Sequence, residues 1–216
     1  MANPGLRERK KTRTRQLIAE VAARLFAEHG YEQVPVSDVA REAEVSEQTV
    51  YNYFQTKEQL VIDRDQHIQD RLVDLIRTRA PGVSPAAAIR DFVLADVDAI
   101  PSTPPEVWRG ELGYLAATSQ TVHRLVLDMI NRQADAIAAA ISDTTPVPAE
   151  VAKLQGIALA GVFQIIISHV GQRTQEGRSP KQIANELHPM IETALSELDR
   201  WFGLSEHPDE HRPPTP

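Results

Sequence analysis

The sequence contains no cysteine, so disulfide bonds and thiolate metal sites are excluded. It also lacks a glycine-rich phosphate loop, a serine nucleophile elbow and a His-Glu-x-x-His metal motif. The seven histidines are scattered, and the pair His207 and His211 is interrupted by Pro208. These absences favour a protein that is not an enzyme, with no cofactor and no bound metal.

Signals for β-strands are also scarce, because no alternation of apolar and polar residues is bounded by turn residues. Apolar residues instead recur every three to four positions, and 15 prolines outnumber 10 glycines. Several prolines follow a serine or threonine, as at the first turn of a helix. The pattern predicts an all-α fold of about nine helices. A chain of 216 residues with 42% apolar content can bury a sizeable core in one or two domains.

The longest stretch without a formal charge lies between Lys153 and Arg173 and approaches the length of a membrane span. Several polar residues interrupt it, and polar groups are costly in lipid. We therefore interpret it as a helix buried in protein. The basic amino terminus is not followed by the apolar core of a signal peptide. We expect a cytoplasmic protein with no membrane contact.

The net charge of −7 argues against nucleic-acid binding, but the charge is unevenly distributed. Residues 7–15 carry six basic residues against Glu8 alone. Local positive charge is what attraction to phosphate requires. A solvated basic tail is the alternative interpretation.

Residues 36–57 read as two short helices joined by a tight turn at Glu44-Val45. Ser46 is placed to cap the second helix, and Val50 and Phe54 give that helix a buried side. The opposite side is rich in amides and hydroxyls, which can read base edges in a major groove. Its residues are Glu47, Gln48, Thr49, Tyr51, Asn52 and Tyr53.

Residues 12–62 resemble the amino-terminal domain of the TetR family of transcriptional regulators. The matching residues are Ile18, Ala22, Leu25-Phe26, His29-Gly30-Tyr31, Val36, Val39-Ala40, Ala43, Val45-Ser46, Thr49 to Phe54, Lys57-Glu58 and Leu60. The chain departs from the family at Glu44, where glycine is usual and suits a left-handed turn. It also has Pro35 where a threonine often caps the second helix, and we expect Ser37 to take over that cap.

The resemblance implies a three-helix DNA-binding domain over residues 1–57, with its helix-turn-helix at about 36–54. A carboxy-terminal effector-binding and dimerisation domain follows at 58–203, and a disordered tail at 204–216. A capping box at Thr56-Lys57-Glu58-Gln59 predicts that the helix shared between the domains opens at Thr56.

The resemblance also assigns the DNA contacts. Gln48 and Thr49 are the expected base readers, and Tyr53 and Lys57 are expected on phosphate. Packing between helices is the alternative for Tyr51 and Tyr53, and a solvated first-turn lysine is the alternative for Lys57. The predicted DNA-binding residues are Thr12, Arg13, Ser37, Ser46, Glu47, Gln48, Thr49, Tyr51, Asn52, Tyr53 and Lys57.

Apolar bulk with sparse polar groups in the second half suits a ligand pocket, and equally an ordinary core. The predicted pocket residues are Phe92, Trp108, Glu111, Tyr114, Met129, Gln133, Phe163, Ile166 and His169. The last two helices are the expected dimer surface, with the monomer's own core as the alternative. The predicted dimer residues are Ile157, Ala160, Gly161, Ile183, Leu187, Met190, Ile191 and Leu195.

Together these features predict a homodimeric transcriptional repressor that binds a palindromic double-stranded DNA operator. A small-molecule effector would shift the helix that begins at Thr56 and release the operator. Two other classes stay open: an architectural DNA-binding protein without an effector, and an enzyme with a helix-turn-helix appendage. Competition between specific and random DNA would distinguish the repressor from the architectural protein. Screening for turnover would distinguish it from the enzyme.

Overall fold

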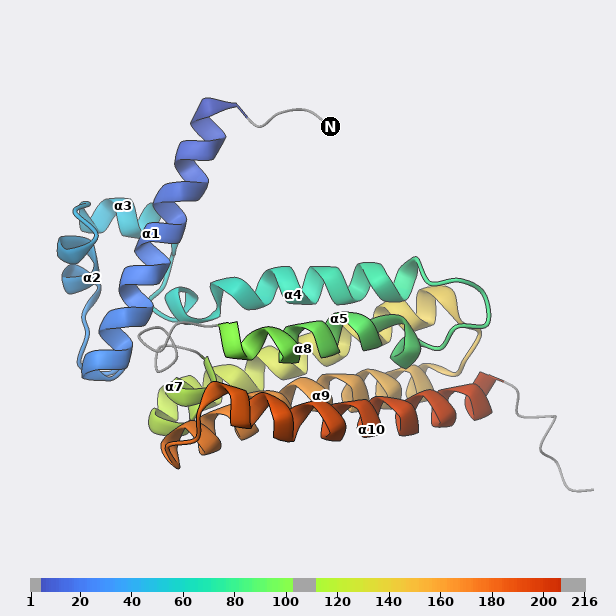
Figure 1. Ribbon diagram of the computed structural model, residues 1–216. Coiled ribbons are helices and arrows are strands. Elements are labelled where there is room, and N and C mark those ends of the chain that lie inside the picture. Colours follow the sequence, from blue (N-terminus) through green and yellow to red (C-terminus); the bar gives the residue numbers. More distant parts are fainter. Residues whose placement is uncertain (1–4, 103–111, 207–216) are drawn as a thin grey trace, which may run out of the picture.

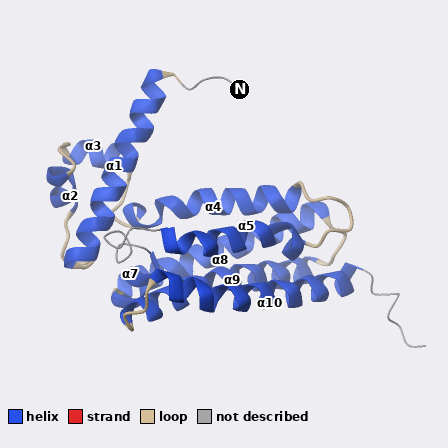
Figure 2. Cartoon of the chain, in the orientation of Figure 1, coloured by secondary structure: helices blue, strands red, loops and turns tan. Residues whose placement is uncertain are grey.

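The computed structural model describes residues 5–102 and 112–206, and within these ranges it is helical without a β-strand (Figure 2). The predicted all-α fold is confirmed. The described elements are α1 (Leu6–His29), α2 (Val36–Glu42), α3 (Glu47–Tyr53), α4 (Gln59–Arg77), α5 (Pro85–Ala99), η1 (Ile100–Ser102), α7 (Leu112–Thr118), α8 (Gln120–Thr144), α9 (Ala149–Gln175) and α10 (Pro180–Glu206). The capping pattern Thr103-Pro104-Pro105-Glu106 predicts a further helix that leads into Val107-Trp108, and this segment lies outside the described residues.

Helices α1 to α3 form a unit at one end of the molecule, with α2 and α3 on one side of α1 (Figure 1). The unit closes on side chains that are almost fully buried, among them Ile18, Phe26, Val50 and Phe54. Helix α1 ends at Gly30, whose φ is 83° and whose N–H donates to the Phe26 carbonyl at 2.9 Å. A glycine that directly follows the apolar repeats of a helix predicts a C-terminal stop of this kind from the sequence.

Apolar residues that recur every three to four positions predict a first helix from about Arg9 to His29, but the structure begins this helix earlier. The helix begins at Leu6, so the basic run is helical and not a loose tail. In Figure 1 the first turns of α1 extend beyond α2 and α3. Within this run the side chains of Arg9, Lys10, Lys11 and Arg13 are exposed. The basic charges are therefore presented along a helix.

Helices α4, α5, α8, α9 and α10 run side by side in the rest of the molecule, with the short α7 at the end near α1 (Figure 1). Their core is built from fully buried aliphatic side chains such as Leu72, Ile89, Ile137 and Leu159. Two of the predicted caps are present. Ser84 Oγ accepts from the Ala87 N–H at 3.1 Å, and Ser179 forms a capping box with Gln182.

Helix α9 is the one described helix that is long and apolar enough to cross a membrane by length and composition. It packs against α7, α8 and α10, and Leu159, Val162 and Ile166 are buried there. This packing favours the interpretation of α9 as a helix of the protein core.

Helix α4 opens at Gln59, three residues after the predicted Thr56. The expected capping box does not form, because Gln59 Oε1 accepts from the Gln55 N–H at 2.7 Å. The preceding turn is held by backbone hydrogen bonds between residues three positions apart, from the Leu60 N–H to the Lys57 carbonyl and from the Val61 N–H to the Glu58 carbonyl. The start of α4 is thus fixed by the turn at residues 57–58.

The far end of α4 is joined to the far end of α8. Arg77 forms an ion pair with Asp143 at 2.9 Å, and the Arg79 guanidinium donates to the Thr144 hydroxyl at 2.6 Å and also to Thr145. The contacts attach the loop after α4 to the last turn of α8.

Two apolar clusters of buried side chains make up the core. The first cluster includes Phe26, Phe54 and Leu60, and continues into Leu115 of α7 and Val126 of α8. The second cluster fills the remaining length of the bundle. The first cluster therefore crosses the predicted boundary between residues 57 and 58, so packed side chains connect the two units.

Candidate nucleic-acid interface

The turn between α2 and α3 lies where the sequence places it. The Val45 N–H donates to the Ala40 carbonyl at 2.9 Å, and the Glu44 N–H donates to the Arg41 carbonyl at 3.2 Å. This pair of bonds satisfies the last carbonyls of α2 and needs a left-handed residue at the turn. Glu44 supplies it with φ of 54°, the only positive φ of a non-glycine residue in the described ranges. An L-residue in this conformation costs about 1 kcal/mol.

Ser46 caps α3, as predicted. Its Oγ accepts from the Thr49 N–H at 3.1 Å and lies 2.8 Å from Thr49 Oγ1. Ser37 does not cap α2. That helix begins at Val36 after an extended Pro35, which leaves Ser37 inside the first turn and no side-chain cap.

Helix α3 turns one side into the core and the other to solvent. Val50 is buried, whereas Gln48, Tyr51 and Asn52 are exposed, with 43% of Tyr51 accessible. Gln48 Nε2 donates to Asn52 Oδ1 at 3.2 Å, one helical turn away. The two amides therefore hold each other in place on the exposed face. Bidentate amides of this kind are suited to adenine edges.

Tyr53 is half-buried against the first cluster, in line with the packing alternative for this residue. Its carbonyl accepts from Arg15 Nη1 at 2.8 Å, and the Arg15 guanidinium stands 4.5 Å from the centre of the Phe54 ring. Arg15 thereby braces α1 on the end of α3. Charge alone groups Arg15 with its basic neighbours, so its role could not be read from the sequence.

Lys57 faces inward. Its Nζ donates to the Tyr31 carbonyl at 2.5 Å and lies 4.2 Å from the centre of the Tyr31 ring and 5.7 Å from that of Phe26. Burial lowers the pKa of Lys57. Neither the expected phosphate contact nor a solvated lysine matches this arrangement. The ammonium instead connects the start of α4 to the loop after α1.

The same loop makes a contact with the second unit that no motif in the sequence indicates. The Ser119 hydroxyl donates to the Glu32 carboxylate, and Ser119 Oγ also accepts the Val122 N–H at 3.1 Å. Ser119 is buried and caps α8. Next to it, burial and the Glu58 carboxylate raise the pKa of Tyr31. The loop at residues 30–35 is thus tied to the starts of both α4 and α8.

The remaining predicted DNA contacts lie on exposed surface. Thr12 and Arg13 are exposed on α1, and Glu47 is exposed at the first turn of α3. Together with Gln48, Tyr51 and Asn52 they leave an accessible polar face along α3 and a basic face along the first turns of α1.

The predicted pocket residues do not gather around one described cavity. Met129 belongs to the first cluster and Ile166 to the second, while Phe163 contacts both. Tyr114 and Phe92 are half-buried, and Gln133 is buried. The His169 Nε2 lies 3.1 Å from Glu186, which also pairs with Arg173, so this histidine joins α9 to α10. Trp108 and Glu111 lie outside the described residues.

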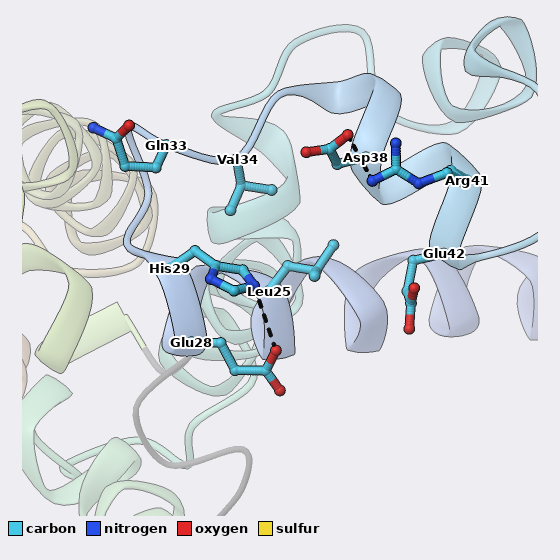
Figure 3. Close-up of a pocket in the computed structure, with 8 residues that line it drawn as sticks. All are labelled: Leu25, Glu28, His29, Gln33, Val34, Asp38, Arg41 and Glu42. Atoms are coloured by element: carbon cyan, nitrogen blue, oxygen red, sulfur yellow. Dashed lines mark ion pairs between the residues drawn. The ribbon is translucent and has the colours of Figure 1, made fainter.

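Open hollows occur elsewhere. One of about 610 Å³ lies between the end of α1 and α2, where His29 faces Glu28 and Arg41 pairs with Asp38 (Figure 3). Another of about 430 Å³ lies between α4 and α8. None of the predicted pocket residues lines either hollow.

Most of the predicted dimer residues lie in the core of the subunit. The fully buried members are Ala160, Ile183, Leu187, Ile191 and Leu195. For these five residues the structure agrees with the alternative of packing inside the subunit: the apolar stripe of α10 packs on α5 and α9 of its own chain, and Ala160 of α9 belongs to the first cluster. Ile157 and Met190 remain exposed, at 50% and 43%, and Gly161 is half-buried.

An apolar exposed face does run along α9. Leu154, Ile157 and Ile165 are 56%, 50% and 44% exposed, and their spacing of three and eight residues puts them on one side of the helix. Gly161 lies between them, with open space where a Cβ would stand. On α10, Met190 and Trp201 are also exposed. Leu154, Ile165 and Trp201 were missed, because periodicity does not tell which of two apolar faces is covered.

Comparison with known proteins gives the family that the amino-terminal domain resembles. Residues 18–63 match the model of bacterial regulatory proteins of the tetR family. The transcriptional regulator TcmR of Streptomyces glaucescens is 33% identical over 86 residues, which cover 40% of this chain and 38% of TcmR. BetI of Agrobacterium fabrum is 27% identical over 162 residues, 72% of this chain and 76% of BetI. With TcmR, the matching region spans less than half of the relative's length.

Solved structures share the fold. A TetR-family transcriptional regulator from Mesorhizobium loti has a TM-score of 0.51 at 16% identity, covering 86% of this chain and 96% of that one. The fatty acid degradation regulator FadR from Bacillus halodurans has a TM-score of 0.51 at 17% identity, covering 88% and 96%. The amino-terminal domain is thus similar to that of the tetR family, and the chain as a whole shares the all-helical fold of these structures.

Proposed function

We propose that the protein is a homodimeric transcriptional repressor that binds a palindromic DNA operator through α3. The observation that carries this proposal is the exposed face of α3, where Gln48 and Asn52 hold each other beside the exposed Tyr51. A short helix with preorganised amides fits a major groove. The proposed base contacts are Gln48 and Thr49, flanked by Glu47, Tyr51 and Asn52.

Phosphate contacts would come from α1 and from the ends of α3. Arg9, Lys10, Lys11 and Arg13 are exposed on α1, so their charges are available to the DNA backbone. Ser46 and Tyr53 lie at the two ends of α3. Lys57 is left out of the proposed contacts, because its ammonium is engaged by the Tyr31 carbonyl.

A dimer follows from the exposed apolar face of α9 and α10. Leu154, Ile157 and Ile165 would otherwise remain in water, and a twofold partner would bury them against their own copies. Two copies would also supply two recognition helices for two half-sites. The proposed dimer residues are Ile157, Gly161 and Met190 from the sequence, with Leu154, Ile165 and Trp201 added.

Release of DNA would require an effector that favours one arrangement of the two units over another. The Ser119–Glu32 hydrogen bond and the first cluster connect the carboxy-terminal bundle to the DNA-binding unit. A movement of α8 would therefore displace the loop that precedes α2. We therefore propose the carboxy-terminal bundle as the effector domain. A cytoplasmic location agrees with a DNA-binding role, and no catalytic role is proposed.

The decisive experiment is competition between the DNA upstream of the protein's own gene and random DNA at one salt concentration. The wild type should prefer the upstream DNA, and Gln48→Ala should weaken that preference by about tenfold to hundredfold while the dimer persists. Gln120→Ala, at an exposed glutamine at the start of α8, serves as the matched control. Equal affinity of the wild type for both DNAs would favour the architectural alternative and end the repressor proposal.

A further inference from the structure

Gln155, in the second quarter of α9, carries a buried side-chain amide whose nitrogen has no hydrogen-bond partner. The side chain is 1% exposed, and its Nε2 is the one buried side-chain nitrogen or oxygen without a partner in the described ranges. A glutamine amide offers two N–H donors. An unmet buried donor destabilises a fold, and native structures keep few of them. Its retention at this position calls for a physical reason.

The neighbours of Gln155 are apolar. Ala152 and Leu159, one turn before and after it on the same side of α9, are both fully buried members of the second cluster. At the adjacent Gly156, a Cβ would collide with the Ala134 carbonyl of α8. The two helices therefore touch through their backbones at this level, and Gln155 is held on a firmly packed part of the bundle.

A second amide lies at the same level. Gln133 of α8 precedes Ala134 and is 5% exposed. One turn before it is Met129 of the first cluster, and one turn after it is Ile137 of the second. On α8, Gln133 thus lies where the two apolar clusters meet, whereas Gln155 on α9 lies within the second cluster. A guest molecule bound between α8 and α9 here would lie at the level of both amides.

The charge of such a guest is limited by its surroundings. The buried polar side chains in the described ranges are all neutral: Ser84, Ser119, Gln133, Thr145 and Gln155. A charged molecule would lose its hydration there without an opposite charge to replace it. A neutral molecule with an acceptor oxygen would meet the unpaired donor of Gln155 and bury its apolar remainder.

We propose that Gln155 is the polar anchor of the effector site, with Nε2 donating to a carbonyl or ether oxygen of an uncharged, otherwise apolar effector. The inference rests on the proposed effector-responsive function and gives the chemical class of the effector. The site lies on α9, whose outer face is the proposed dimer surface, and against α8, whose first turn is bonded to Glu32. An occupant would therefore act on both the dimer and the DNA-binding unit.

The first test needs no effector. Gln155→Met keeps the length of the side chain and removes the unmet donor, so the variant should melt at a higher temperature than the wild type. Gln164→Met, at an exposed position on the same helix, is the matched control and should melt as the wild type does. A lower melting temperature for Gln155→Met would mean that the amide already has a partner, such as an ordered water, and would overturn the proposal.

The second test uses three six-carbon ring probes of similar size: cyclohexanone, methylenecyclohexane and cyclohexanecarboxylate. Binding is followed by the NMR signals of the Gln155 side-chain NH₂, identified by their loss in Gln155→Met. In the wild type, cyclohexanone should shift these signals and bind about tenfold more tightly than in Gln155→Met, the difference expected for one hydrogen bond. Methylenecyclohexane should bind both proteins equally, and the carboxylate should bind neither.

Other outcomes count against the site. Equal affinity of cyclohexanone for the wild type and Gln155→Met, absence of binding by all three probes, or tighter binding of the carboxylate would each overturn it. Operator affinity of the wild type without any probe is measured in parallel. Loss of the probe effect with specific operator binding intact refutes the Gln155 anchor alone, whereas absent operator preference with the probe effect intact refutes the repressor proposal.

Discussion

Helices α3 and α9 both expose one face, and the two faces differ in chemistry. The outer face of α3 is made of amides, hydroxyls and one tyrosine, whereas that of α9 is made of Leu154, Ile157 and Ile165. Polar groups remain well solvated in water until DNA replaces the water. An apolar stripe is destabilising in water, and covering it lowers the free energy. For the proposed dimeric repressor, this difference predicts that α9 is covered in every functional state and α3 only on DNA.

The largest effect is expected from charges on α9. Leu154→Asp combined with Ile157→Asp should dissociate the dimer, because two carboxylates would face their own copies across the interface. Operator affinity should then fall by at least about a thousandfold, toward non-specific binding. Sedimentation velocity and operator titration measure the two effects. The control carries aspartates at the exposed Asn131 and Ser142 of α8, and a double variant on α9 that stays dimeric would contradict the proposed surface.

A smaller effect is expected from the basic face of α1. Lys10→Gln with Lys11→Gln should weaken binding to specific and random DNA alike, because phosphate contacts carry no sequence information. The slope of log affinity against log salt should decrease by about 0.9 for each lysine–phosphate pair that the substitutions remove. Lys181→Gln on α10 is the control. An unchanged salt slope would mean that these side chains do not contact the DNA, and would restrict the interface to α3.

The cap of α3 should have a moderate effect on stability. Ser46→Ala removes the acceptor of the Thr49 N–H and should lower the free energy of unfolding by about 1 kcal/mol in urea titrations. Ser168→Ala, at an exposed position within α9, should change the free energy of unfolding by at most a few tenths of a kcal/mol. A decrease at Ser46 no larger than that at Ser168 would show that α3 is held by packing of Val50 and Phe54 alone.

The smallest effect concerns acid stability. Hydrogen bonds from its own backbone N–H, Thr56 and Tyr31 lower the pKa of Glu58 below its ordinary value of 4.5. The folded state therefore binds this proton less readily than the unfolded state. The stabilising contribution is present above the unfolded pKa and is lost as pH falls through the folded pKa.

Glu58→Gln should consequently show a shallower loss of stability than the wild type between about pH 6 and about pH 3 in urea midpoints. Tyr31→Phe removes one of the hydrogen bonds to Glu58. Its loss of stability with falling pH should be intermediate between those of the wild type and Glu58→Gln. The exposed Glu192→Gln is the control. Parallel pH profiles for Glu58→Gln and the wild type would contradict the assignment.

Local chemistry made part of the structure predictable from the sequence. The turn at Glu44, the cap at Ser46 and the stop at Gly30 each depend on a few consecutive residues, and all three occur as expected. The all-α class followed from periodicity over the whole chain. The exposed face of α3 could be outlined for the same reason, since Val50 and Phe54 fix which side is buried.

Several of the failures involve partners distant in sequence. The position of the Lys57 ammonium depends on the Tyr31 carbonyl, and the coverage of Leu187 depends on which helix packs over α10. The Ser119–Glu32 bond joins residues 87 positions apart, and neither belongs to a motif. Periodicity identifies an apolar stripe but not the surface that covers it, so core and interface could not be separated on α10.

The attachments of α8 restrict how the DNA-binding unit can respond. Its first turn is bonded to Glu32, beside the Tyr31 carbonyl that holds the start of α4, and its last turn is bonded to Arg77 and Arg79 at and just beyond the end of α4. Because α4 and α8 are attached to each other at both ends, they cannot slide past each other and can only tilt together as a frame. A push anywhere along α8 would then reach α3 as a rotation of that frame, and in the proposed dimer the separation of the two copies of α3 would change in proportion to the length of the two helices.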